Sequence, residues 1–279
     1  MNTIKAELNK IILALTSVGL VLLMLPASLS ATHFRYGTMS WNLDNSTTIR
    51  LTLQVGYRTG YNVYLATAGL TKTNQVSINW GDGTSNDTPL VKTTSVVGDG
   101  SSLVEVGANS GPGGTWVAGV THTYADNGTY IVSWVSTARI ENIKNIPDSD
   151  DKDWRLETKV TIGGIHAGNV SPVSAVPPVV QVQDNTTDNF TYQISATDAN
   201  TGDNLHYRWG TYKEFIDNTS VATYSKPTGM ELTSGGLVTW DVRDSVLGDD
   251  AGEGTGGGED GAVWSTFIMV LDNGSSGDN

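Results

Sequence analysis

Side chains that could carry out catalysis are scattered along this chain and form no known catalytic motif. The four histidines are His33, His122, His166 and His206, and none belongs to a His-Glu-x-x-His pattern or another close metal-binding pair. The chain has no cysteine, which excludes thiolate catalysis, disulfides, iron–sulfur clusters and Cys-ligated zinc. It also has neither a Gly-x-Ser-x-Gly nucleophile turn nor a glycine loop that would hold a phosphate. We therefore expect no enzymatic activity and assign no catalytic residue.

Three further features have both a chemical and a structural interpretation. A glycosidase needs only two carboxylates at the right separation, but none of the 29 Asp and Glu residues stand out as such a pair. The acidic run 148–153 lacks the glycine at position 6 and the glutamate at position 12 of a helix–loop–helix calcium site, which favours a solvated loop. Trp116 lies in a glycine-rich stretch, where it could either form a platform for sugar binding or anchor a loop.

The composition limits the class of protein that the chain can be. The 279 residues include 16 Lys and Arg against 29 Asp and Glu, a formal net charge of −13. Such an acidic chain has no electrostatic basis for binding nucleic acid or an anionic membrane surface. The length suits one large domain or two ordinary ones, and the 32 glycines indicate many turns.

Residues 1–30 have the pattern of a secretory signal peptide. Lys5 and Lys10 precede an apolar run over residues 11–25, and small residues precede a cleavage position after Ser30. The apolar run is shorter than the roughly 20 residues that a membrane-spanning helix needs. We therefore expect cleavage, no membrane insertion afterwards, and a mature protein that is secreted, extracellular or held at the cell surface.

After this segment, apolar residues alternate with polar ones and show no helical period. Ile49, Leu51, Leu53 and Val55 share one face of a predicted strand, while residues 130–135 are apolar on both faces, as in a central strand. Further strands are predicted at 33–42, 75–80, 102–106, 155–162, 190–195, 205–209, 236–242 and 263–271. Many short strands separated by turns predict an all-β fold of two tandem immunoglobulin-like β-sandwiches.

A proline-rich stretch suggests where the first sandwich ends. Residues 168–178 contain Pro172, Pro177 and Pro178, and we place the domains at 31–167 and 168–279. The glycine- and acid-rich residues 248–261 predict a flexible loop. Asn273-Gly274 is a hairpin signal with no strand after it, so the second sandwich is expected to lack its last strand. Either a longer protein continues, or the open edge accepts a strand from another subunit and forms a filament.

Two motifs in the first domain carry a family resemblance. Trp80-Gly81-Asp82-Gly83-Thr84 combines a core Trp with a tight turn, and His122-Thr123-Tyr124 and Asp126-Asn127-Gly128-Thr129-Tyr130 follow it. The last of these is typical of the tyrosine corner of immunoglobulin-like sandwiches. Together they resemble the PKD (polycystic kidney disease) domain family, which implies an extracellular spacer, adhesion or carbohydrate-associated module. The 40 residues between Asp82 and His122 exceed the usual family spacing, and we expect the excess to form a glycine- and serine-rich excursion over 98–119.

Residues 179–272 resemble the Ig-like and cadherin-like repeats of secreted surface proteins. The resemblance rests on Ala196-Thr197-Asp198-Ala199-Asn200, on Pro227-Thr228-Gly229-Met230 and on Gly236-Leu237-Val238-Thr239-Trp240. Acidic turns coordinate calcium in cadherin-like repeats. The resemblance therefore implies calcium ligands at Asp198, Asn200, Asp203 and Asp272, whereas the alternative is that these side chains bond their own backbone in turns.

Eight Asn-x-Ser/Thr triplets could accept N-linked sugars in a host that glycosylates secreted proteins. A chain this rich in Asn, Ser and Thr contains several by chance, and we interpret them so. Their asparagines are Asn45, Asn86, Asn127, Asn169, Asn185, Asn189, Asn218 and Asn273.

These patterns predict a secreted, non-catalytic structural or adhesion protein of the cell surface or extracellular matrix, stiffened by calcium or forming filaments. Its expected partners are other surface proteins, glycans or copies of itself. The alternative function is a carbohydrate-binding accessory module of a secreted hydrolase, with Trp116 as the sugar contact.

Overall fold

The computed structural model describes much of the chain after the predicted signal peptide, within one compact unit over residues 31–279. The turn predicted at 99–100, the loop 248–261 and the final Asn273-Gly274 signal lie outside the described residues, as does the signal peptide. The described residues are 34–59, 68–69, 71–73, 77–86, 90–96, 101–109, 116–137, 139–141, 143–146, 149, 152–175, 180, 182, 189–216, 226–242 and 263–272.

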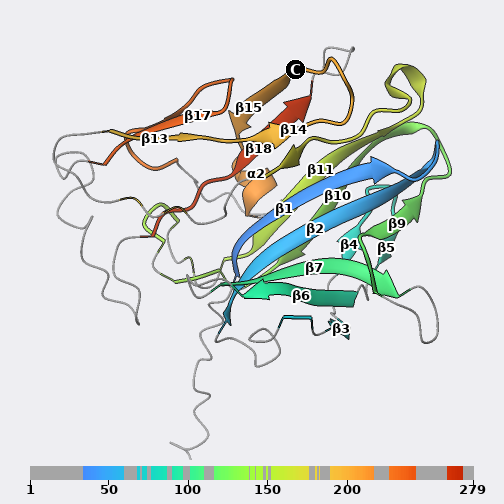
Figure 1. Ribbon diagram of the computed structural model, residues 1–279, viewed down its shortest axis with the longest axis horizontal. Coiled ribbons are helices and arrows are strands. Elements are labelled where there is room, and N and C mark those ends of the chain that lie inside the picture. The colour runs from blue at the N-terminus through green and yellow to red at the C-terminus, as the bar shows by residue number, and fades with distance from the viewer. Residues whose placement is uncertain are drawn as a thin grey trace, which may run out of the picture. The chain divides into compact units, whose positions relative to one another are not determined.

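The predicted all-β class is confirmed, because strands make up nearly all the regular structure of the described residues, and every pairing between the named strands is antiparallel. The first part of the chain forms two sheets that face each other (Figure 1). One sheet has the order β1 (Phe34–Leu43), β2 (Thr48–Arg58), β7 (Ser101–Asn109), β6 (Leu90–Val96) and β3 (Thr71–Thr73), with β8 (Trp116–Ala118) on β7 and β9 (Val120–Thr123) on β2. The other sheet has the order β11 (Trp154–Ile162), β10 (Gly128–Ser136), β4 (Ile78–Asn79) and β5 (Ser85–Asn86).

The core between these sheets follows from the alternation in the sequence. Ile49, Leu51, Leu53 and Val55 of β2 are all fully buried, as predicted, and they meet the Trp residues of the opposite sheet. The prediction that β10 is a central strand is also confirmed, because it lies between β11 and β4. The buried Trp side chains are Trp41, which lies in β1 of the same sheet as β2, and Trp80, Trp134 and Trp154.

The strand predicted at 102–106 is confirmed, and most of the described residues within the expected excursion over 98–119 belong to the first sheet. Residues 101–109 are strand β7, which pairs with β2 on one side and β6 on the other, and residues 116–118 are strand β8. Val104 and Val106 alternate inward, as the predicted strand implies, and are buried in the core. The long spacing between Asp82 and His122 therefore adds strands to the first sheet. Several predicted strands differ in their bounds: among the described residues β4 covers Ile78–Asn79, and the final strand begins at Ile268.

The second part of the chain has three small antiparallel sheets around its own core. These sheets are β12 (Val173–Ser174) with β14 (Ala196–Thr197), β13 (Asn189–Gln193) with β17 (Leu237–Asp241) and β16 (Met230–Leu232), and β15 (Leu205–Trp209) with β18 (Ile268–Asp272). Tyr207, Val238 and Trp240 lie in this core. Helical structure among the described residues includes α2 (Tyr212–Phe215) and the 3-10 turn η4 (Gly164–His166). The domain boundary at 168 stays a prediction.

A third apolar cluster joins residues from both parts of the chain. Its buried members include Ile143 on one side and Phe215 of α2 on the other. Arg139 lies in the same place with only 1 % of its surface exposed. Its guanidinium stacks on the Phe215 ring at 4.1 Å and donates hydrogen bonds to the carbonyls of Phe215 (2.7 Å) and Asp153 (3.0 Å). Planar stacking combined with directed donors is a property of arginine that lysine does not share.

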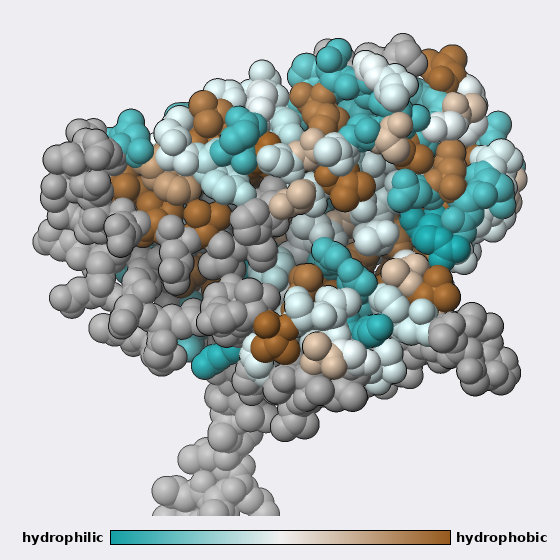
Figure 2. All heavy atoms as spheres, in the orientation of Figure 1, coloured by the Kyte–Doolittle hydropathy of each residue, from teal (hydrophilic) through white to brown (hydrophobic). Residues whose placement is uncertain are grey.

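Hydrophobic residues occur as separate spots among hydrophilic ones on the face shown in Figure 2. Among the described residues, the exposed aliphatic side chains include Ile131 and Val135 on the outer side of β10, and Ile165 in η4. Isolated apolar residues of this kind are normal on a protein surface.

Candidate metal centre

Three of the four predicted calcium ligands come together in the fold. One carboxylate oxygen from each of Asp198, Asp203 and Asp272 lies within 4.8 Å of the other two, and all three residues are half-buried. Asp198 directly follows β14, and Asp203 lies two residues before β15. Asp272 joins them because β18 pairs with β15 in a register that sets Asp272 opposite Leu205.

Two oxygens of this acidic cluster (Asp198, Asp203 and Asp272) are buried with no hydrogen-bond partner. They are Oδ2 of Asp198 and Oδ2 of Asp203. Asp198 uses its other oxygen to accept from the Asn200 backbone N–H at 2.7 Å, which is ordinary turn chemistry. Burial raises the pKa of Asp198, and the negative charges of Asp272 and Asp203 raise it further. Buried carboxylate oxygens without donors are costly, and a cation would remove that cost.

The donor set determines which cation would suit the cluster. All three donors are carboxylate oxygens, which hard cations such as Ca²⁺ and Mg²⁺ prefer. Ca²⁺ binds oxygens at 2.3–2.6 Å, so two ligands on opposite sides of the ion are separated by roughly 5 Å. The observed spread of 4.8 Å therefore fits one calcium ion. Calcium takes six to eight oxygens, so backbone carbonyls or water would have to complete the shell.

Asn200, the fourth predicted ligand, is engaged elsewhere. Its side-chain oxygen accepts from the Val170 backbone N–H at 3.0 Å, and its side-chain nitrogen donates to the Gly168 carbonyl at 3.0 Å. The side chain thus holds the connector segment, residues 168–171, against the turn that carries Asp198 and Asp203. The structure gives Asn200 a positioning role beside the cluster.

Asn169 in the connector segment was missed by sequence reasoning. Its side-chain nitrogen donates to Oδ2 of Asp272 at 3.1 Å. Nothing in the local pattern around Asn169 indicates this contact, because the two residues are 103 positions apart.

The connector segment also bonds to the first sandwich. The hydroxyl of Ser171 accepts from the Trp41 backbone N–H at 2.7 Å, and the Ser171 N–H donates to the Trp41 carbonyl at 3.1 Å. Ser171 is buried. A hydrogen-bonded path therefore runs from β1 through the connector segment to Asn200 and the acidic cluster.

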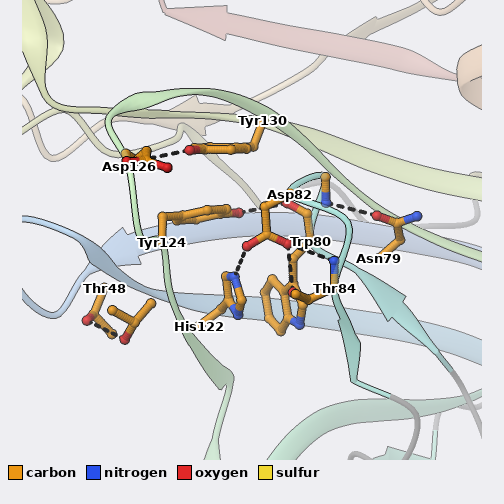
Figure 3. Close-up of polar contacts among 11 residues, drawn as sticks. Thr48, Asn79, Trp80, Asp82, Thr84, His122, Tyr124, Asp126 and Tyr130 are labelled. Carbon is orange, nitrogen blue, oxygen red and sulfur yellow. Dashed lines mark hydrogen bonds and ion pairs between the residues drawn. The ribbon is translucent and has the colours of Figure 1, made fainter.

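The motif that resembles a PKD domain forms a second polar network (Figure 3). His122 Nε2 lies 2.7 Å from Oδ2 of Asp82, and its ring stacks on the Trp80 ring at a centroid distance of 4.6 Å. Oδ1 of Asp82 accepts from the N–H and the hydroxyl of Thr84. Burial alone would raise the pKa of Asp82, but the hydrogen bonds from Thr84 and His122 outweigh it and lower this pKa to about 2.

Two tyrosines complete this network by bonding to the backbone. Tyr124 is buried and donates to the Trp80 carbonyl at 3.0 Å, whereas Tyr130 donates to the Asp126 carbonyl at 2.9 Å near the surface. The Tyr130 contact is the bond that a tyrosine corner makes. Burial, with the nearby charges of Asp82 and Tyr130, raises the pKa of Tyr124, so its hydroxyl stays a donor.

The His122–Asp82 pair resembles part of a catalytic triad only in its geometry. A triad needs a nucleophilic hydroxyl on the other ring nitrogen of the histidine. Among the described residues no hydroxyl bonds to that nitrogen, and the Thr84 hydroxyl is committed to Asp82. We therefore interpret this network, with Gly83 (φ +90°) in its turn and Gly128 at the start of β10, as structural.

Trp116, the predicted sugar contact, lies in strand β8 and is half-buried, whereas the sequence suggested a loop. Its ring packs on Gly107 so closely that a methyl group there would lie 2.8 Å from the indole. The ammonium of Lys92 lies 4.8 Å from the ring centre. Both contacts suit a Trp that anchors β8 to its sheet, and the role in carbohydrate binding stays a prediction.

No helix among the described residues is long and apolar enough to cross a membrane.

Comparison with known proteins identifies similar sequences. The sequence model of the family "Integrin beta-like protein A-E, N-terminal" matches residues 35–163, which contain the strands of the first sandwich except for Phe34, the first residue of β1. The chain is 29 % identical over 216 residues to integrin beta-like protein C of Dictyostelium discoideum, a match that covers 74 % of this chain and 10 % of the relative. Integrin beta-like proteins B (29 % over 213 residues) and A (27 % over 262 residues) of the same organism match 73 % and 87 % of this chain and 10 % and 11 % of their own lengths.

The chain thus spans about a tenth of the length of the curated relatives that it matches. No solved structure matches it significantly. The resemblance to PKD domains stays a prediction, since the comparisons do not include that family. What they do show is similarity to the N-terminal part of integrin beta-like proteins A to E.

Proposed function

We propose that this chain is a non-catalytic part of a cell-surface adhesion protein. The observation that carries the proposal is the match of residues 35–163 to the N-terminal family of integrin beta-like proteins. The all-β architecture suits a spacer or binding module, and the His–Asp pair of the first sandwich is committed to structural contacts. The partners would be other surface molecules, bound outside the cell.

We further propose that calcium binds Asp198, Asp203 and Asp272 and stiffens the junction beside the connector segment. Two features support this: the carboxylates gather around two buried oxygens without donors, and they contact the connector segment through Asn169. A bound cation would offset both the burial and the repulsion from Asp272 and Asp203 that raise the pKa of Asp198. It would thereby favour the arrangement in which the connector segment bonds to both Trp41 and the cluster.

Thermal unfolding with calcium, with magnesium and with a chelator tests the calcium site. At a calcium concentration 100-fold above Kd, binding adds about 2.7 kcal/mol, which for a unit of this size raises Tm by about 5–10 °C. Asp203→Asn should abolish that increase without lowering the Tm of the metal-free chain, because it removes a repelling charge. Glu141→Gln, which removes an exposed charge outside the cluster, should keep the full increase. An unchanged Tm in calcium and chelator would reject the site.

The same site predicts a pH dependence of the metal-free chain. The pKa of Asp198 is raised above 3.8, so the folded chain binds a proton more readily than the unfolded chain. Its stability should therefore increase as the pH falls from neutral through the folded pKa, and Asp198→Asn should remove this gain. Calcium affinity should decrease over the same pH range, because protons compete for the carboxylates.

Adhesion is tested with beads coated with the purified chain. We expect them to bind to cells of the source organism, or to one another, more than beads coated with serum albumin. Calcium-dependent binding that is lost in Asp203→Asn and kept in Glu141→Gln would connect the metal site with adhesion. Binding no greater than that of the albumin beads would contradict the adhesion proposal even if calcium raises Tm.

A further inference from the structure

The Asn-x-Ser/Thr triplets differ in how the fold uses their asparagine side chains. An N-linked sugar is attached to the side-chain nitrogen, so a glycan suits the folded protein only where this nitrogen faces solvent. The side-chain oxygen stays an acceptor after modification. The structure describes the side chains of four of these asparagines: Asn45, Asn127, Asn169 and Asn189.

Asn45 lies in the exposed turn between β1 and β2. Its oxygen accepts from the backbone N–H groups of Thr47 (3.0 Å) and Thr48 (2.9 Å), and the Thr47 hydroxyl lies 3.4 Å from the same oxygen. Among the described residues its nitrogen has no hydrogen-bond partner. All the bonds that hold this turn through the Asn45 side chain therefore use the oxygen, and a sugar on the nitrogen would leave them in place.

Asn189 is the first residue of β13, and its side chain is exposed. Asn189 and Thr191 of its triplet share the solvent face of the strand, while Phe190 and Tyr192 point to the core. Within the described residues β13 is the edge strand of its sheet, next to β17. A glycan here would project into solvent and protect an open edge from pairing with another chain.

Asn169 shows the opposite arrangement. Its nitrogen donates to Asp272 in the acidic cluster, the residue is half-buried, and Ser171 of its triplet is buried against Trp41. A sugar on this nitrogen would replace the donor and place a bulky group in the cluster. Asn127 packs both its amide oxygen and its amide nitrogen against Gly163, so its contacts favour neither a glycosylated nor an unmodified side chain.

We propose that Asn45 and Asn189 carry N-linked glycans and that Asn169 does not. This inference rests on the proposed location outside the cell, because sugar transfer takes place in the secretory pathway. The three sites differ in the side-chain atom that the fold uses for hydrogen bonds. Asn45 uses its oxygen, Asn169 uses its nitrogen, and Asn189 uses neither atom in any described bond.

The test is site mapping on the full chain secreted by a eukaryotic cell line that N-glycosylates its exported proteins. Release of the glycans by peptide N-glycosidase in ¹⁸O water converts each glycosylated Asn into labelled Asp, which peptide mass spectrometry locates. We expect label at positions 45 and 189 and unmodified Asn at 169. Asn45→Gln and Asn189→Gln should each remove one glycan's mass from the intact protein without reducing its secretion.

A second sample separates this inference from the proposed location. In it, the leader of an established secreted protein replaces residues 1–30, so that residues 31–279 enter the secretory pathway whether or not their own leader works. Unlabelled Asn45 or Asn189 in this secreted sample, or labelled Asn169, would overturn the glycan assignment. If the full chain fails to reach the medium while the second sample carries the expected labels, the result would count against the proposed location. The same result would support the glycan sites.

Discussion

Replacing Tyr124 with Phe removes a single hydroxyl from the centre of the network in Figure 3. This hydroxyl donates to the Trp80 carbonyl at 3.0 Å, and Tyr124 is only 1 % exposed. The Phe ring would keep the stacking on Tyr130, at a centroid distance of 4.1 Å, and the edge contact with His122. The substitution therefore isolates one hydrogen bond from the packing around it.

The expected loss of stability follows from the burial of both partners. A hydrogen bond of this kind contributes about 1 kcal/mol net, and a carbonyl left buried without a donor costs about 1–3 kcal/mol. We therefore expect Tyr124→Phe to lower the free energy of unfolding by about 2 kcal/mol. Tyr130→Phe is the matched control, because it removes a hydroxyl of similar geometry whose partner, the Asp126 carbonyl, is near solvent. Water can replace that donor, so its cost should be within about 0.5 kcal/mol.

Urea unfolding of the two variants, followed by Trp fluorescence in the presence of a chelator, measures this difference. The midpoint should fall clearly in Tyr124→Phe and hardly at all in Tyr130→Phe, with the m-value unchanged in both. Equal losses in the two variants would refute the reasoning, because burial of the acceptor would then have no effect. A lower m-value in Tyr124→Phe alone would mean that the native state had loosened.

Three other substitutions test the packing and electrostatics of the fold. Gly81→Ala should cost about 2 kcal/mol more than Gly83→Ala, which thermal denaturation can measure. Both glycines have positive φ and would be strained by a side chain, but only at Gly81 would the added methyl group lie 2.7 Å from the Ile131 backbone. Arg139→Leu should lose about 3 kcal/mol in urea unfolding, since the buried Phe215 carbonyl and the part-buried Asp153 carbonyl lose a charged donor, and Arg139→Lys should recover only part of it. Asp82 has a pKa lowered to about 2, so its contribution to stability should be complete above pH 4 and disappear as the pH falls toward 2. An acid titration of Asp82→Asn should show a flatter dependence in that range.

Much of the fold could be predicted from local patterns. The alternation of Ile49, Leu51, Leu53 and Val55 predicts strand β2 and its buried face, because side chains of a strand point to opposite sides in turn. The turn at Asp82 and Gly83 is equally local, since it needs only a side-chain acceptor and a residue that accepts positive φ. Strands β6 and β8 were not predicted, because their short or serine- and threonine-rich sequences pair only when a neighbouring strand is already present.

Some contacts of the acidic cluster can likewise be expected from the sequence, whereas others depend on the fold. Asp198 and Asp203 are five positions apart in a turn, and their closeness is visible in the sequence. The family resemblance also indicated Asp272, but the register of β18 on β15 is what brings it to the other two. Asn169 joins the cluster only through the path of the connector segment along β1 and the turn at Asn200. Local sequence specifies strand faces and turns, because these depend on steric and hydrogen-bonding preferences of neighbouring residues. Contacts across long separations, such as the 103 positions between Asn169 and Asp272, depend on which strands pair and in what register, which the packing of the whole fold decides.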